Sequence, residues 1–189
     1  MLGHIKSNLW AVFTVTFLTF CIALAVSVGS EALVKAVNNI FVDLILLIII
    51  IFLGVFFDMI GTAAAAATLP PFNAKAAKKV FGANQAVRIT KNASLVANYT
   101  ADVGGDIAGT LSGAVGAGIV YNLIHVFSFP DIVLTGAIMT SLIAALTTGG
   151  KAIGKSIAIS NANAIIFKVA VAAGWWEKLT GIELLKDKR

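Results

Sequence analysis

The sequence contains few charged residues, a single cysteine and two histidines. Charged residues make up 12% of its 189 residues, whereas a soluble domain usually carries about 25%. The one cysteine, Cys21, excludes a disulfide framework, and no spacing of cysteine and histidine is typical of a zinc site. Acids are scarce too, with nine Asp and Glu against fourteen Lys and Arg. Together with a mean hydropathy of +0.95, this composition indicates an integral membrane protein.

Long apolar runs predict the fold class, an all-α integral membrane protein. A membrane-spanning helix needs roughly 20 residues. The predicted spans are residues 8–29, 40–62, 95–124 and 132–148 of a single membrane domain, residues 1–189. The first run follows a lysine, as in a signal peptide, but it is long enough to span and lacks a clear small-residue cleavage site. We therefore expect it to be retained as a helix.

Basic residues dominate the connections assigned to the cytoplasmic side. Residues 70–92 carry five Lys and Arg and no acid, and Val80 and Phe81 interrupt them. This pattern predicts short amphipathic helices on the membrane face. Residues 160–185 include the pair Trp175 and Trp176 beside charged residues, which is typical of a membrane interface, and we expect a second juxtamembrane segment there. The positive-inside rule then places both termini in the cytoplasm, for a protein of the cell or inner membrane.

Acids inside apolar segments are the candidate functional residues. Asp102 and Asp106 are one helical turn apart in the third predicted span, and Asp58 lies near the end of the second. A carboxylate in hydrocarbon costs about 2.5–3.5 kcal/mol on insertion scales, so such residues are expected to have a use. Asn98 and Thr110 continue the four-residue spacing of the two acids, which on an α-helix produces one polar stripe.

The oxygen donors predict a cation site. Two carboxylates four residues apart cannot both ionise at low cost unless a cation lies between them. Hard oxygen donors suit Mg²⁺, Ca²⁺ or Mn²⁺ over soft metals, while residue type alone equally allows Na⁺ or H⁺. The alternative is purely structural, with protonated acids forming hydrogen bonds between helices, or with Asp58 bonded to a hydroxyl or a lysine at the interface. The predicted metal ligands are Asp58, Asp102 and Asp106, assisted by Asn98, Thr62 and Thr110.

Three stretches also resemble those of a known family. Residues 56–63 are similar to FFSGSETA at the end of that family's first helix, and residues 92–105 to its NPERLL and GNN stretch. Residues 150–164 are similar to its GEIIPKSIA and NPE signature, which is the most specific of the three. The order and spacing agree as well. Over residues 44–173 the chain therefore resembles the transmembrane domain of the CNNM/CorC cation-transporter family.

The resemblance carries implications for fold and function, and the sequence departs from the family at several positions. The family is dimeric and binds Mg²⁺ among polar residues in a three-helix membrane domain, which implies such a core here, with residues 8–29 as an extra transmembrane helix. In this chain, residues 58–61 replace the family's Ser-Gly-Ser-Glu, and Gly104 and Gly105 replace its paired asparagines. Lys151 and Gly154 replace its glutamate and proline, and the sequence carries no CBS regulatory domain.

Taken together with the resemblance, the sequence predicts a membrane protein that binds and moves a divalent cation, Mg²⁺ first. Its partners are expected to be the lipid bilayer and a second copy, packed through the glycine-rich helix of residues 95–124, and not nucleic acid. Two alternatives stay open, a non-transporting scaffold or accessory subunit and a Na⁺- or H⁺-coupled carrier of another substrate. The sequence offers no combination of a nucleophile and a base, so we do not expect an enzyme. Residues 149–156 fit the bare P-loop pattern but follow a membrane helix, which is the wrong context for a nucleotide site.

Overall fold

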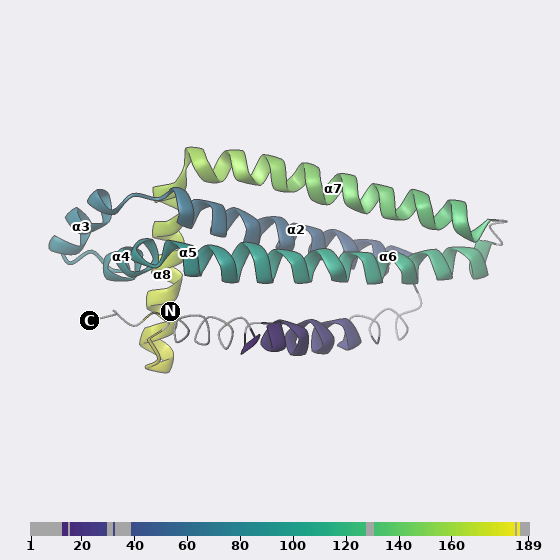
Figure 1. Cartoon of the computed structure of the whole chain (residues 1–189), viewed down its shortest axis with the longest axis horizontal. Coiled ribbons are helices and arrows are strands. Elements are labelled where there is room, and N and C mark those ends of the chain that lie inside the picture. Colours follow the sequence, from purple (N-terminus) through teal and green to yellow (C-terminus); the bar gives the residue numbers. More distant parts are fainter. Residues whose placement is uncertain are drawn as a thin grey trace, which may run out of the picture. The chain divides into compact units, whose positions relative to one another are not determined.

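The part of the chain that the structure describes consists of helices and their connections. A computed structural model describes residues 13–14, 16–29, 32, 39–127, 131–183 and 185, and none of these residues forms a strand. An apolar helix spans Thr16–Gly29. The elements that follow are α2 (Ile40–Ala66), α3 (Leu69–Ala77), α4 (Ala83–Lys91), α5 (Ala93–Ala97), the π-helix η1 (Asn98–Gly104), α6 (Gly105–Phe127), α7 (Ile132–Ser160) and α8 (Ala162–Thr180) (Figure 1).

Among the residues that the structure describes, three helices are long and apolar enough to cross a membrane. They are Ile40–Ala66, Ala93–Ile124 and Ile132–Ser160, so the second of them runs through α5, η1 and α6. A helix the length of α2, 27 residues, extends roughly 40 Å, whereas the hydrocarbon core of a bilayer is about 30 Å thick. The predicted span of residues 8–29 lies partly outside the described residues. The helix Thr16–Gly29 within it is shorter than the other three, so a fourth span stays a prediction.

Polar caps fix where two of these helices begin. The Phe41 backbone N–H donates to Asn39 Oδ1 at 3.0 Å. The backbone N–H groups of Val133 and Leu134 donate to Asp131 Oδ1 at 2.9 and 3.1 Å. Such caps satisfy the N–H groups that the first turn of a helix leaves without a partner. They explain why α2 and α7 start where the apolar runs of the sequence start.

The chain divides into two compact units. One comprises Met1–Ile51 and Ile107–Leu146, and the other comprises Phe52–Asp106 and Thr147–Arg189. In the first unit, buried side chains of α2, α6 and α7 form an apolar core of Leu47, Ile50, Ile51, Ala108, Leu111, Val115, Ile119 and Ile143. The same unit buries Asp43, which is 1% exposed and accepts a hydrogen bond from Asn122 Nδ2 at 3.1 Å. The sequence analysis did not single out Asp43.

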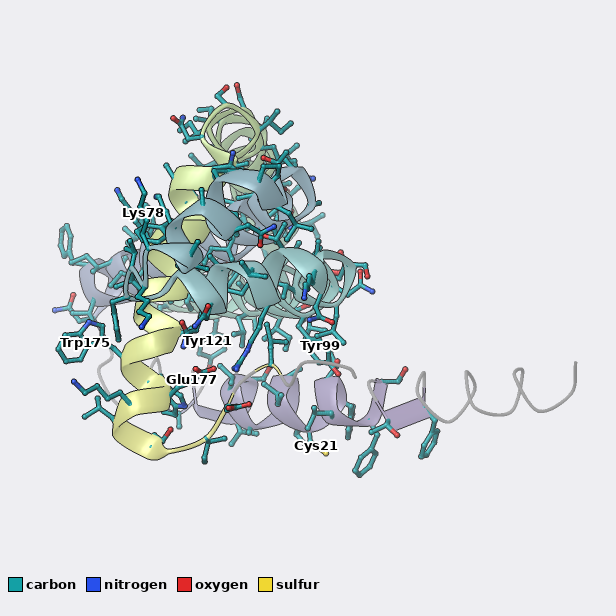
Figure 2. The ribbon with its side chains drawn as sticks, turned by 90° about the vertical axis from the view of Figure 1, so that its left-hand side faces the viewer. Cys21, Lys78, Tyr99, Tyr121, Trp175 and Glu177 are labelled. Carbon is teal, nitrogen blue, oxygen red and sulfur yellow. The ribbon has the colours of Figure 1, made fainter. Side chains whose placement is uncertain are left out.

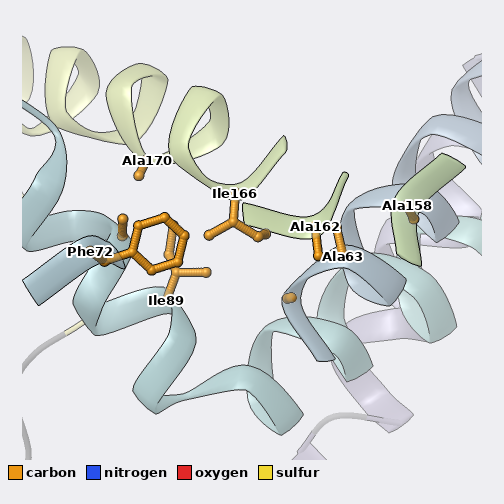
Figure 3. Close-up of a cluster of buried hydrophobic side chains, with 9 residues drawn as sticks. Ala63, Phe72, Ile89, Ala158, Ala162, Ile166 and Ala170 are labelled. Atoms are coloured by element: carbon orange, nitrogen blue, oxygen red, sulfur yellow. The ribbon is translucent and has the colours of Figure 1, made fainter. Parts of the chain in front are cut away.

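The second unit has its own core, to which the short helices α3 and α4 and the helix α8 contribute. Figure 3 shows Phe72, Ile89 and Ile166 meeting in it, and Phe72 is 1% exposed. Gly82, with φ of 82°, turns the chain between α3 and α4, and its Cα has no room for a side chain because Val171 of α8 lies against it. The buried residues of this second core are Ala63, Ala64, Phe72, Ala86, Ile89, Ala158, Ala162, Ile166 and Ala170. The location of α3 and α4 on a membrane face stays a prediction.

Candidate cation site

Asp58 is a buried carboxylate on the second half of α2. The residue is only 6% exposed. Its Oδ1 lies 3.8 Å from Lys155 Nζ, a distance that allows charge attraction but exceeds a hydrogen bond. Its Oδ2 is buried and has no hydrogen-bond partner among the residues that the structure describes. A buried carboxylate oxygen without a partner is uncommon and calls for an explanation.

A second acid and a second lysine lie beside this pair. Asp106 Oδ1 is 3.9 Å from Lys151 Nζ. A Cβ placed on Gly105 would lie 3.6 Å from Lys151 Nζ and 3.9 Å from Asp58 Cβ, so the lysine and the buried acid approach the same backbone position. We call Asp58, Asp106, Lys151 and Lys155 the Asp–Lys cluster. Its two negative and two positive charges balance.

Glycines bring the helices of the cluster close together. Positions 150 and 154 are four residues apart on α7, and a Cβ on Gly150 or Gly154 would lie 2.8 or 3.1 Å from the Val55 side chain of α2. Residues four apart lie on one helix face, so both glycines allow α2 to approach. Each glycine precedes one of the two lysines, and this places both ammonium groups beside the acids. Small residues allow this kind of close backbone approach between membrane helices.

The π-helix supplies a similar contact on the other side of α2. A Cβ on Gly61 would lie 2.7 Å from Ala101 Cβ and 2.8 Å from Thr100 Oγ1. A Cβ on Gly104 would lie 3.1 Å from the Phe57 ring. π-helical turns are rare and often occur at functional sites. Here the π-turns separate Asp102, which is within η1, from Asp106, which is in the first turn of α6.

The predicted ligands are distributed unequally around this cluster. Four of the predicted ligands are exposed, namely Asn98, Asp102, Thr110 and Asp106, and the Asp106 side chain is 79% exposed. Thr62 is partly buried and lies one turn after Asp58. Thr110 belongs to the first of the two units. Within the described ranges, no group of three or more His, Cys, Asp or Glu side chains can hold a metal ion. The structure therefore brings Asp58 and Asp106 of the predicted ligands into one cluster with two lysines.

The lysines of the cluster were not among the predicted site residues. Lys151 entered the sequence comparison only as a departure from the resembled family, and both lysines lie in the segment that fits the bare P-loop pattern. The available signal was their spacing: two Gly-Lys pairs four residues apart, directly after an apolar run. Their helix α7 continues to Ser160 without a break, so residues 149–156 form no phosphate-binding loop.

Comparisons with models of protein families, with curated proteins and with solved structures find no match to this chain. Its class follows from its own features. The part of the chain that the structure describes is helical, three of its helices are long and apolar enough to cross a membrane, and all three contribute residues to the Asp–Lys cluster.

Proposed function

We propose that the chain is an integral membrane protein that binds and moves a cation, Mg²⁺ first, at the Asp–Lys cluster. The observation that carries this proposal is the buried Oδ2 of Asp58, which no described donor satisfies. A carboxylate in an apolar segment is expensive, and such residues mark ion pathways in membrane proteins. The proposal follows the resemblance of residues 44–173 to the CNNM/CorC transmembrane domain, and the chain's own geometry supports it.

The lysines would act as exchangeable counter-ions. Lys155 Nζ is 3.8 Å from Asp58 Oδ1, and the Lys155 side chain is 54% exposed, so its ammonium group has room to withdraw when a cation arrives. Lys151 is 24% exposed and would withdraw from Asp106 in the same way. Charge balance is kept in both states, because the lysines neutralise the acids in the empty site and the cation does so in the filled one.

Two carboxylates are enough for the proposed cargo. Mg²⁺ usually keeps several of its waters and is bound through one or two carboxylates, so it does not need a cage made entirely of protein ligands. Asp58 and Asp106 would provide these, and Thr62, one turn after Asp58, would hydrogen-bond a retained water. Asn98 and Asp102, in the same unit as the cluster, would line the approach to it, since both are exposed. Transport would then need a rocking motion that exposes Asp58 to the opposite side.

The proposal also covers the assembly and the orientation of the chain. We expect a homodimer through the helix of residues 95–124, because a Cβ on Gly109 or Gly113 would find no atom within 4 Å. An open glycine surface is suited to close packing with a partner helix. Both termini would lie in the cytoplasm, in keeping with the basic residues of the connections.

One observation favours a second candidate, a non-transporting scaffold or accessory subunit. Each acid of the cluster has a lysine within 4 Å. In a scaffold, these charge pairs would have a structural role alone, which is to hold α2, α6 and α7 together. A Na⁺- or H⁺-coupled carrier of another substrate would use the same acids. Cation flux into liposomes distinguishes these candidates from the proposed one, since a scaffold gives no flux.

Thermal melting of the purified chain tests whether the cluster binds a cation. Mg²⁺ at about 100 times its Kd should stabilise the folded chain by ~2.7 kcal/mol, and we expect smaller effects from Na⁺. Asp58→Asn should lose this stabilisation and Asp106→Asn should weaken it. Asp43→Asn is the matched control, because Asp43 is equally buried but lies in the other unit, and it should respond to Mg²⁺ like the wild type. Full Mg²⁺ stabilisation of Asp58→Asn would reject the site.

A further inference from the structure

Aromatic and basic side chains gather where the turn between α3 and α4 meets the second half of α8. Lys78, Lys79 and Phe81 come from the turn, and Trp175 and Lys178 come from α8. We call these five residues the aromatic–basic patch. Phe81 is 48% exposed and Trp175 is 56% exposed. Figure 2 shows Lys78 and Trp175 projecting outward on the same side of the view.

The local backbone holds the patch in place. Lys79 has φ of 54° and Gly82 has φ of 82°, and this pair of left-handed residues reverses the chain so that α4 packs on α8. The Phe81 ring meets the Trp175 ring edge-on, with centroids 6.0 Å apart. Gly174 allows the contact, because a Cβ there would lie 3.2 Å from Phe81 Cζ. Lys178 Nζ lies 5.9 Å from the centroid of the Trp175 ring, within cation–π distance.

The nearby acids are held away from the patch by Arg88. Arg88 Nη1 lies 3.8 Å from Glu177 Oε1 and 3.5 Å from Glu183 Oε2. Gln85 Nε2 also donates to Glu177 Oε2 at 2.7 Å, and the Glu177 side chain is only 13% exposed. In the described part of the chain, no acid lies within ion-pair distance of the lysines of the patch, Lys78, Lys79 and Lys178. Among the described residues, the three positive charges of the patch therefore have no acidic partner.

We propose that the aromatic–basic patch binds the headgroup of an anionic phospholipid. Its charge is complementary to a lipid phosphate, and Trp beside Lys is the combination that locates at the level of the headgroups. Other helices of the chain are long and apolar enough to cross the bilayer, and their insertion would keep the patch close to the membrane surface. The occupant is a lipid of the surrounding leaflet, with its phosphate beside Lys178 and its acyl chains along Phe81 and Trp175. This inference rests on the proposed membrane location and is independent of the cation site.

Quenching of tryptophan fluorescence by brominated lipids tests the patch in the full chain. A Trp10→Phe background restricts the signal to Trp175 and Trp176, and a chelator removes divalent cations. Brominated phosphatidylglycerol, titrated into the chain in neutral detergent, should bind at least about fivefold more tightly than brominated phosphatidylcholine. Lys178→Gln should weaken the binding of phosphatidylglycerol about fivefold and leave that of phosphatidylcholine unchanged, which corresponds to the loss of one lysine near a lipid surface.

Lys168→Gln is the matched control, since Lys168 is an exposed lysine on the same helix but outside the patch, and it should change the affinity less than twofold. Equal affinity for the two lipids would overturn the proposal, and so would equal effects of the two lysine variants. If inorganic phosphate displaced brominated phosphatidylglycerol as effectively as unlabelled phosphatidylglycerol does, the patch would be a site for free anions. That result would also contradict the proposal. Because Mg²⁺-dependent melting is measured separately, a negative result here leaves the cation site standing, and the reverse also holds.

Discussion

Asparagine in place of Asp58 is expected to reduce cation uptake by reconstituted liposomes about a hundredfold, to the level of empty vesicles. The substitution preserves the shape of the side chain but removes the negative charge that would replace the hydration shell of the ion. A contact with a charged group in an apolar environment is strong, and a loss of ~2.7 kcal/mol corresponds to that factor. Uptake of Mg²⁺ would be followed with an indicator dye inside the vesicles.

The fold should survive this substitution, because Asp58 makes no hydrogen bond through Oδ2 and its lysine partner is 54% exposed and can move away. Melting of the purified variant in chelator verifies this. Asp43→Asn is again the control and should transport normally. Uptake by Asp58→Asn at the wild-type rate would refute a role for Asp58 in transport, and absence of uptake by the wild type itself would favour the scaffold.

Valine in place of Gly61 is expected to produce the largest loss of stability, roughly 3 kcal/mol. A Cβ at this position would lie 2.7 Å from Ala101 Cβ and 3.0 Å from the Ala101 backbone nitrogen, so the π-helix η1 has to shift as a whole. Overpacking of a tight contact usually costs about 1–3 kcal/mol, and rigid backbone on the opposite side puts this case at the upper end. The free energy of unfolding would be measured by denaturant titration in detergent micelles.

Gly109→Ala provides the comparison for this effect. A Cβ on Gly109 would find no atom within 4 Å, and alanine is the better helix former by about 1 kcal/mol. We therefore expect an unchanged or slightly raised stability for Gly109→Ala. Equal stability of Gly61→Val and Gly109→Ala would mean that α2 and η1 do not approach each other as closely as described.

The beginnings of the long helices could be predicted from the sequence, but the full extent of α7 could not. Residues 40 and 132 open apolar runs directly after Asn39 and Asp131, which are good helix caps. The predicted span of residues 132–148 stopped before the Gly149-Gly150 pair, whereas α7 continues to Ser160. Glycine lowers helix propensity, but Gly150 packs against Val55, and packing of this kind overrides local propensity.

The candidate site was predictable only in part, and for a similar reason. Charge in an apolar segment identified Asp58, which proves to be buried. The four-residue spacing of Asp102 and Asp106 assumed an α-helix, but Asp102 lies in π-helical turns, and nothing in the local sequence indicates such turns. The pairing with Lys151 and Lys155 depends on contacts between segments far apart in the chain. Such contacts can be predicted only when the three-dimensional arrangement of the helices is known, and composition and spacing do not give this arrangement.

Carbodiimide labelling of the buried acids tests the central claim most directly. Dicyclohexylcarbodiimide enters apolar regions and modifies carboxyl groups, and mass spectrometry of peptides measures the modification at Asp58 and, as an internal reference, at Asp43. We predict that Mg²⁺ protects Asp58 severalfold, with the same half-saturation as in melting, and leaves Asp43 unchanged. Labelling of Asp58 that is insensitive to Mg²⁺, Mn²⁺, Ca²⁺ and Na⁺ alike would contradict a cation site at the Asp–Lys cluster.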